Sequence, residues 1–270
     1  MTSATNLETR VSGSVHYHVG GAGEPLLLLH GLAGSSRNWC EALPALVGRY
    51  RVISVDLPGH ARSGALQRGA TTADFASSVA AVLDAESVEG ALVAGHSFGG
   101  LVALRLAQRR PELVRGLLLA SPAGIASSTR TARAIVHAAT TIRPARFAAV
   151  FRHRLAGRAW YRRAVFRPWF VSDAVALSER ATHGLLGAQP EHVDTRTAGR
   201  ALVADDPRAD LDGVSCPIVL LWGARDAQLP LEDAFEYARR LRAKLRLVAD
   251  CGHLVIVERP EAVVDALAAL

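Results

Sequence analysis

Gly95-His96-Ser97-Phe98-Gly99-Gly100 lies between a short apolar run, residues 90–95, and a helix-like pattern, residues 98–109. The pattern G-x-S-x-G between a strand and a helix is typical of a tight turn that lifts a serine hydroxyl above the end of a sheet. Glycine leaves room for the backbone to close such a turn, and the N–H groups of the following helix favour developing negative charge. We therefore interpret Ser97 as a nucleophile; the alternative is a surface turn without chemistry.

On either side of this turn, short apolar runs alternate with amphipathic stretches of helical length. Strands are predicted at residues 15–19, 25–30, 51–56, 90–95, 114–120, 217–222 and 245–249, and helices at residues 38–47, 72–85, 98–109, 231–241 and 260–270. This alternation predicts an α/β fold, with a mostly parallel twisted sheet and helices on both faces. Residues 15–19 alternate as an edge strand would, and Thr71 is placed to cap the helix that follows it.

One long segment interrupts the alternation, since a connection in an α/β unit usually has about two to six residues. Residues 124–203 are rich in alanine, arginine and leucine, and prolines at positions 144, 168 and 190 divide them into three or four short helices. We predict that residues 1–123 and 204–270 form the core of the molecule. Residues 124–203 are expected to form a helical cap, or lid, over a cleft.

A serine hydroxyl is a weak nucleophile at neutral pH and needs a base, which in turn needs an orienting carboxylate. In proteins with a turn of this kind, the acidic residue and then the basic residue lie downstream in the sequence, in loops after later strands. Asp226 follows the predicted strand 217–222, and His253 follows the strand 245–249. Because the carboxyl ends of parallel strands share one edge of a sheet, we expect Ser97, Asp226 and His253 to meet there. The competing candidates lack this position: they are His60, His96, His137, His153, His183 and His192 for the base, and Asp205, Asp206, Asp210 and Asp212 for the acid.

A tetrahedral intermediate also needs donors for its oxyanion. One is expected to be the backbone N–H of Phe98, the residue after the nucleophile. We assign the other to the N–H of Leu32, in the loop Gly31-Leu32-Ala33-Gly34 that follows the predicted strand 25–30. His30 precedes this loop and either borders the substrate or forms a structural turn with an internally bonded imidazole.

With these residues in place, the chain resembles an α/β-hydrolase of the type that carries a helical cap. The resemblance runs through His30-Gly31, Asp56-Leu57-Pro58-Gly59-His60, the turn around Ser97, Gly223-Ala224-Arg225-Asp226 and Gly252-His253. It implies this fold, a Ser97–His253–Asp226 triad, and a loop beside the site formed by residues 56–63. A simple turn stabilised by Asp56 and His60 is the other interpretation of that loop.

The resemblance also narrows the reaction. Family members that open epoxides or remove halide carry aspartate where this chain has Ser97, and hydroxynitrile lyases use a lysine in the site, whereas Lys244 here begins a strand. We expect a serine hydrolase that cleaves a carboxylic ester or thioester through an acyl-enzyme, with no metal and no cofactor. A carbon–carbon bond hydrolase of ring-cleavage products is an alternative, although many of these carry Asn and Trp where this chain has His96 and Leu254.

The predicted cap supplies most candidates for substrate contact. Trp160 and Trp169 either line an apolar pocket or pack the cap against the core. Arg162 and Arg163 either reach the cleft, where a guanidinium suits a carboxylate or phosphate, or lie on a solvated face. Together with His30 they are the candidate substrate-binding residues. An acidic carrier protein is a further possible partner for such a basic face.

Composition excludes several classes of protein. The chain of 270 residues is 50% hydrophobic and 21% charged, which is typical of a folded domain and not of a disordered chain. Its net charge is +6, but residues 124–203 contain thirteen arginines and four acidic residues, so this segment carries +9 and the remainder −3. Since no basic stripe interleaved with stacking aromatics lies outside the segment, we expect no nucleic-acid partner.

No apolar run approaches the ~20 residues of a membrane span, and the first residues lack the apolar region of a secretory signal. The three cysteines are far apart and odd in number, which favours reduced thiols and a cytoplasmic location. A noncatalytic small-molecule receptor on the same fold is the second class of function to test. The sequence does not predict an oligomeric state.

Overall fold

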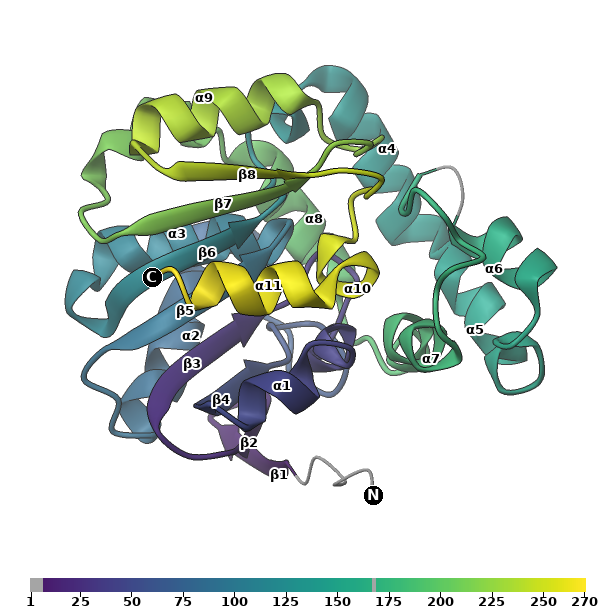
Figure 1. Cartoon of the computed structure of the whole chain (residues 1–270), viewed down its shortest axis with the longest axis horizontal. Coiled ribbons are helices and arrows are strands. Elements are labelled where there is room, and N and C mark those ends of the chain that lie inside the picture. Colours follow the sequence, from purple (N-terminus) through teal and green to yellow (C-terminus); the bar gives the residue numbers. More distant parts are fainter. Residues whose placement is uncertain (1–6, 167–168) are drawn as a thin grey trace.

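The computed structural model describes residues 7–166 and 169–270 (Figure 1). In this part of the chain eight strands form one sheet, in the order β1-β2-β4-β3-β5-β6-β7-β8. β1 and β2 are antiparallel to their neighbours, and the strands from β4 to β8 along this order are parallel to one another. The strands are β1 (Glu8–Ser12), β2 (Val15–Gly20), β3 (Glu24–Leu29), β4 (Tyr50–Val55), β5 (Ala91–His96), β6 (Val114–Ala120), β7 (Ile218–Gly223) and β8 (Lys244–Val248).

Helices connect these strands. The α-helices are α1 (Leu43–Val47), α2 (Thr72–Ala85), α3 (Phe98–Arg109), α4 (Arg130–Ile142), α5 (Pro144–Leu155), α6 (Ala159–Phe166), α7 (Glu179–Gly187), α8 (Thr195–Ala204), α9 (Leu231–Leu241), α10 (Val255–Glu258) and α11 (Pro260–Leu267). The 3-10 turns are η1 (Ser36–Trp39), η2 (Pro111–Leu113), η3 (Ala126–Ser128), η4 (Pro207–Ala209) and η5 (Leu211–Gly213). The predicted cap of α2 is present, because Thr71 and Asp74 each accept a hydrogen bond from the other's backbone N–H.

Two apolar cores cover the two faces of the sheet, as the period-two geometry of strands requires. Within β3, Leu27 and Leu29 belong to a core with side chains of α2, α3, α8 and α9. The alternate residues Leu26 and Leu28 belong to a second core with side chains of α1, α10 and α11. The predicted mostly parallel sheet with helices on both faces is therefore confirmed, and the continuous apolar run in β3 reflects burial on both sides.

The predicted edge strand at residues 15–19 is wrong in one respect. β2 pairs with β4 on one side and with β1 on the other, so β1 is the edge strand. Residues 8–12 are mostly polar, and their exposed and half-buried side chains leave little apolar pattern in the sequence. The burial of β2 alternates because only one of its faces is fully covered. An inner strand next to the edge of a sheet can show this pattern as well as an edge strand can.

Between β6 and β7 the described chain contains five α-helices, α4 to α8, where the sequence predicted three or four in residues 124–203. Figure 1 shows α5, α6 and α7 beyond the sheet, on the side toward which the parallel strands point. Tyr161, Phe166 and Leu186 of these helices join the second core, which continues from the sheet into the insert. In the described residues, no helix combines the length and apolar character needed to cross a bilayer.

Candidate active site

Ser97 occupies a strained turn between β5 and α3. Its backbone has φ 52° and ψ −116°, in a region that favours glycine, and it is the N-cap of α3. Such a conformation costs about 1–3 kcal/mol and persists only where the surroundings impose it. Here the Ser97 N–H donates to the carbonyl of Ala120, and its carbonyl accepts from the N–H groups of Gly100, Leu101 and Ala123. The Ser97 residue is partly exposed.

Two glycines make this turn possible by close approach of the backbone. A Cβ on Gly95 would overlap the carbonyl oxygen of Gly99, and one on Gly99 would lie 2.5 Å from the carbonyl oxygens of Leu29 and His30. Real side chains do not tolerate such distances. The flanking glycines of the G-x-S-x-G motif are therefore needed to pack the start of α3 against β5 and against the end of β3.

Asp226 and His253 form a buried pair at the same edge of the sheet. Asp226 follows β7, His253 follows β8, and Asp226 Oδ2 lies 2.8 Å from His253 Nδ1. The side chains are 0% and 5% exposed, respectively. Asp226 Oδ1 accepts the backbone N–H groups of Gln228 and Leu229 at 2.8 and 2.9 Å, which fixes the carboxylate. With an ionised Asp226 as acceptor, Nδ1 carries the proton and Nε2 is left as the basic nitrogen.

The electrostatics keep Asp226 ionised. Burial by itself would raise the pKa of this carboxyl, but the charge and hydrogen bond of His253 and the two backbone donors outweigh burial. The net result is a pKa below the ordinary value for aspartate. A carboxylate that stays charged in a dry site can orient an imidazole and stabilise it when it becomes protonated.

His96, the residue before Ser97, contacts the main chain of His253. Its Nε2 lies 3.0 Å from the carbonyl oxygen of His253 and therefore donates to it, and the two rings are 5.0 Å apart. Burial, followed by the proximity of His253, lowers the pKa of His96 to about 3, so the ring is neutral. The hydrogen bond ties the main chain at His253 to the residue next to Ser97.

The loop after β3 is held in a fixed conformation against the Ser97 turn. The Gly31 carbonyl accepts from His30 Nδ1 at 2.7 Å and from the Gly34 N–H at 3.0 Å. Because a trans peptide points its N–H opposite to its C=O, these bonds also fix the direction of the Leu32 N–H. A Cβ on Gly31 would lie 3.2 Å from Ser97 Cβ, so the loop touches the turn. Neither the Leu32 nor the Phe98 N–H has a hydrogen-bond acceptor within residues 7–166 and 169–270.

Three buried histidines hold this loop through backbone atoms. His30 Nε2 accepts the Leu57 N–H, and His60 Nε2 accepts the Ala33 N–H, both at 3.0 Å. His192, from the insert, accepts the Ala61 N–H at 2.8 Å, and its Nε2 lies 2.9 Å from the Ala33 carbonyl. The rings are stacked edge to face, with His60 5.0 Å from His30 and 5.5 Å from His192. Each ring accepts one backbone N–H, which requires the neutral form.

Burial keeps these rings neutral. It lowers the pKa of His60 to about 4 and that of His192 to about 3, and it holds the pKa of His30 well below the usual value. Neighbouring histidines add to the effect at His30 and His192. The observed contacts of His30 agree with the second interpretation of this residue, a structural turn with an internally bonded imidazole.

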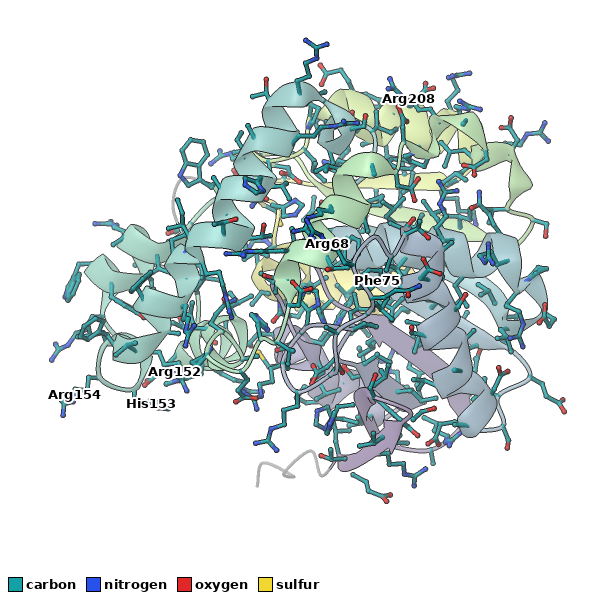
Figure 2. All side chains as sticks on the ribbon, turned by 180° about the vertical axis from the view of Figure 1, so that it is seen from behind. Arg68, Phe75, Arg152, His153, Arg154 and Arg208 are labelled. Atoms are coloured by element: carbon teal, nitrogen blue, oxygen red, sulfur yellow. The ribbon has the colours of Figure 1, made fainter. Side chains whose placement is uncertain are left out.

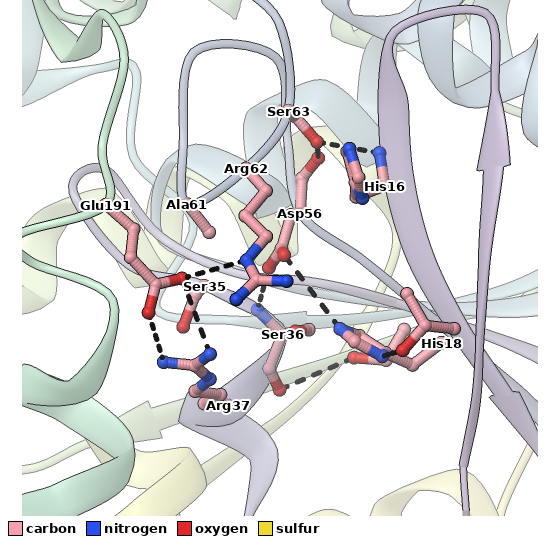
Figure 3. Close-up of polar contacts among 12 residues, drawn as sticks. His16, His18, Ser35, Ser36, Arg37, Asp56, Ala61, Arg62, Ser63 and Glu191 are labelled. Carbon is pink, nitrogen blue, oxygen red and sulfur yellow. Dashed lines mark hydrogen bonds and ion pairs between the residues drawn. The ribbon is translucent and has the colours of Figure 1, made fainter.

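The loop of residues 56–63 is a second structural turn next to the site (Figure 3). Asp56 Oδ1 accepts the Ser36 N–H at 2.7 Å, and the Asp56 carbonyl accepts the Ser63 hydroxyl at 2.6 Å. Glu191 of the insert contacts Arg37 at 3.2 Å and Arg62 at 3.7 Å. Asp56 and His60 thus stabilise the turn, and Glu191 attaches the insert both to this turn and to the segment that follows β3.

The other predicted substrate contacts are not gathered in a closed pocket. Arg162 donates to the carbonyls of Ala156, Ala174 and Val175 at 2.9 to 3.2 Å, so its guanidinium holds the insert together. This structural use argues against assigning Arg162 to the substrate. Trp160 and Trp169 are 60% and 63% exposed, and Arg163 is also exposed.

Sequence reasoning missed His96, Gln189 and His192 as contributors to the site. Gln189 Nε2 donates to the Ala33 carbonyl at 2.6 Å, beside His192. These contacts join residues that are 156 to 159 positions apart in the sequence, and no local pattern predicts them. Within the described ranges, no cluster of three or more His, Cys, Asp or Glu side chains could hold a metal ion.

Comparison with known proteins gives three findings. A family model described as the alpha/beta hydrolase family matches residues 26–266. The chain is 35% identical to the pimeloyl-[acyl-carrier protein] methyl ester esterase of Aromatoleum aromaticum, over 87% of this chain and 93% of that protein. The solved structure of the esterase RhEst1 from Rhodococcus sp. ECU1013 has a TM-score of 0.72 and 27% identity, with 97% of each chain covered.

The chain also resembles part of a longer protein. It is 31% identical, over 92% of its own length, to the dihydrolipoyllysine-residue acetyltransferase component of the acetoin cleaving system of Pseudomonas putida. It spans only 63% of that protein, and between 30% and 63% of the length of the first three curated relatives.

Proposed function

Since the chain belongs to the alpha/beta hydrolase family, we propose that it is a serine hydrolase that cleaves a carboxylic ester or thioester. Ser97 is the nucleophile, His253 the general base and acid, and Asp226 the residue that orients and stabilises the imidazole. The N–H groups of Leu32 and Phe98 form the oxyanion hole. The observation that supports this most is the buried 2.8 Å contact of Asp226 with His253 at the sheet edge that carries the strained Ser97 turn.

The proposed reaction has two halves. Ser97 Oγ bonds to the carbonyl carbon while its proton passes to His253 Nε2, and the carbonyl oxygen becomes an oxyanion that accepts from Leu32 and Phe98. When the bond to the leaving oxygen or sulfur breaks, His253 donates the proton to the alcohol or thiol. Water then attacks the acyl-enzyme with His253 as base, which releases the acid and restores Ser97.

The insert between β6 and β7 is proposed to act as a cap over this site, and the chain on either side of residues 124–203 as the hydrolase core. Its attachment through Gln189, His192 and Glu191 to the loops at Ala33 and residues 56–63 supports this. Two of the relatives above are named as esterases, which favours ester cleavage over the carbon–carbon bond reaction.

Hydrolysis of a series of p-nitrophenyl esters of increasing acyl length tests the proposal, with labelling by a serine-reactive fluorophosphonate as a second readout. Ser97→Ala is expected to lower kcat by about 10⁴-fold or more and to abolish labelling. Ser87→Ala is the matched control, because Ser87 is exposed and also has φ 52°. A folded protein that resists the label and hydrolyses none of the esters would favour the noncatalytic receptor instead.

A further inference from the structure

The surface of α4, α5 and α6 combines exposed apolar side chains with unpaired cations. Half of the large hydrophobic side chains that the described chain exposes, six of twelve, lie on these helices. On these three helices, Ile135, Ile142, Phe147, Val150, Phe151 and Trp160 are between 57% and 68% exposed. Six arginines of the same segment are exposed as well: Arg130, Arg133, Arg146, Arg154, Arg158 and Arg163. We call these twelve side chains the basic apolar surface.

One side of α5 exposes large apolar side chains to water, whereas a helix of a globular protein normally presents polar side chains there. Phe147, Val150, Phe151 and Arg154 are spaced i, i+3, i+4 and i+7, so they lie along one side of the helix. Ala149 and the partly buried Leu155 pack toward the second core. Large apolar side chains grouped in this way on a surface mark an interaction site, whereas scattered single ones do not.

The charge of this surface is of one sign. The sequence contains no acidic residue between Glu112 and Asp173, so α4, α5 and α6 carry none. In the described ranges, none of the six arginines takes part in an ion pair, although ion pairs are frequent on the rest of the molecule. Arg152, His153 and Arg154 lie at the outer end of the insert, well away from the sheet (Figure 2).

We propose that the basic apolar surface docks on an anionic lipid bilayer. Arginine binds lipid phosphates with paired hydrogen bonds, and exposed Phe, Trp, Ile and Val side chains can enter the boundary between headgroups and acyl chains. A second copy of this chain is a poor occupant, because two surfaces of six arginines each would repel one another. A bilayer accepts apolar side chains from three separate helices without a shape-matched partner surface, which favours it over a folded acidic protein.

This docking is peripheral, because no helix of the described residues can span a bilayer. It would bring the insert, which is attached to the loop after β3, to the lipid surface. If the proposed hydrolase activity holds, apolar esters dissolved in the bilayer are the substrates that gain most from it. Binding to lipid does not itself depend on that activity, so the two proposals can fail separately.

Flotation of the full chain with lipid vesicles tests the inference. Vesicles of equal parts phosphatidylcholine and phosphatidylglycerol are expected to carry the protein, and binding should weaken as salt screens the arginines. Vesicles of phosphatidylcholine alone are expected to bind at least about tenfold more weakly. Ser97→Ala should float like the parent protein, which separates lipid binding from catalysis.

Two double variants address the two components of the surface. R146Q/R154Q is expected to lower the partition coefficient about 25-fold, roughly fivefold for each arginine lost near an anionic surface. F147S/F151S is expected to lower it at least about tenfold, through loss of apolar insertion. The matched controls are R49Q/R68Q and F235S, which change exposed residues of the same types outside the insert and should leave binding unchanged.

Far-ultraviolet circular dichroism and thermal melting establish that each variant is folded before it is scored. Equal flotation of R146Q/R154Q or F147S/F151S and their controls overturns the proposal, as does equal binding to neutral and anionic vesicles. Absence of vesicle binding together with arginine-dependent binding to an acidic carrier protein also overturns it, in favour of a protein partner.

Discussion

At the scale of single residues, the candidate site contains one backbone conformation and one charge state that are unfavourable by themselves. Ser97 sits at positive φ because the hydrogen bonds of its N–H and C=O hold it there. Asp226 remains ionised although it is buried, because His253 and two backbone N–H groups contact it. In both cases surrounding contacts offset the free-energy cost of an unfavourable local state.

Asp226→Asn tests the role of the carboxylate. An amide can accept from His253 only weakly and can instead donate to it, which favours the wrong tautomer of the imidazole. We expect kcat for an ester substrate to fall by about 10⁴-fold at neutral pH, with little change in KM. Steady-state kinetics measure this, and Asp250→Asn is the control, since Asp250 is exposed and paired with Arg225 nearby. Similar losses in both variants would remove Asp226 from the mechanism.

Part of the candidate site could be predicted from the sequence, because the order of Ser97, Asp226 and His253 along the chain is constrained by the sheet. Ser97, Asp226 and His253 were predicted to meet at one edge of the sheet. Asp226 and His253 are in contact at 2.8 Å, since each follows a strand of the same parallel sheet, and Ser97 follows β5 of that sheet. The contact of His96 with the His253 carbonyl could not be predicted. It depends on the tautomer and orientation of a buried ring whose partner lies 157 residues away.

At the scale of elements, strongly periodic segments were predicted to the residue. α3, β6 and α9 begin and end where the sequence places them, because Pro111, buried apolar runs and amphipathic spacing define their limits. The predicted helix at residues 38–47 instead forms η1 and the short α1. Pro44, at the first turn of α1, and the reciprocal bonds of Ser35 and Asn38 favour two short pieces over one continuous helix.

The attachment of the insert to the loop after β3 gives a prediction at this scale. His192→Phe preserves a planar ring but removes the bonds to the Ala61 N–H and the Ala33 carbonyl. We expect about 1–3 kcal/mol of lost stability and a roughly tenfold lower kcat, because the Leu32 N–H is less firmly positioned. Chemical denaturation and ester kinetics measure the two effects. His183→Phe, at a half-buried position of α7, is the control; a stability loss with unchanged kcat would leave His192 a purely structural residue.

At the scale of the whole molecule, the buried neutral histidines make stability depend on pH. His30, His60, His96 and His192 all have pKa values lowered by burial, to about 4 for His60 and about 3 for His96 and His192. In the unfolded chain they bind protons near pH 6.5, which the folded protein does not. The unfolded state therefore gains protons as pH falls from about 6.5 toward 4, and folding stability decreases over this range.

The expected slope is roughly 1.4 kcal/mol per pH unit for each such histidine. Urea denaturation at pH 7, 6 and 5 measures it, and His192→Gln should remove the contribution of one group. The lowered pKa of Asp226 acts in the same direction at lower pH, because its stabilising contribution is lost as pH falls through its folded value. Stability that stays constant between pH 7 and pH 5 would contradict the assignment of these rings as neutral.

The overall architecture followed from the sequence, but the arrangement of the insert did not. Its helices have no sheet to impose a register, and their positions depend on contacts such as those of Glu191, Gln189 and His192 with distant loops.

Those contacts affect the design of chimeras in which the insert is exchanged between proteins of this fold. The Ala33 carbonyl receives donors from Gln189 and His192, and Gly59 accepts the N–H groups of Val193 and Asp194. A chimera that imports a foreign insert without residues 189–194 would lose the contacts that hold the loop after β3, even with every core residue intact. The junction of such a chimera should therefore be placed before residue 189, so that residues 189–194 remain with the core.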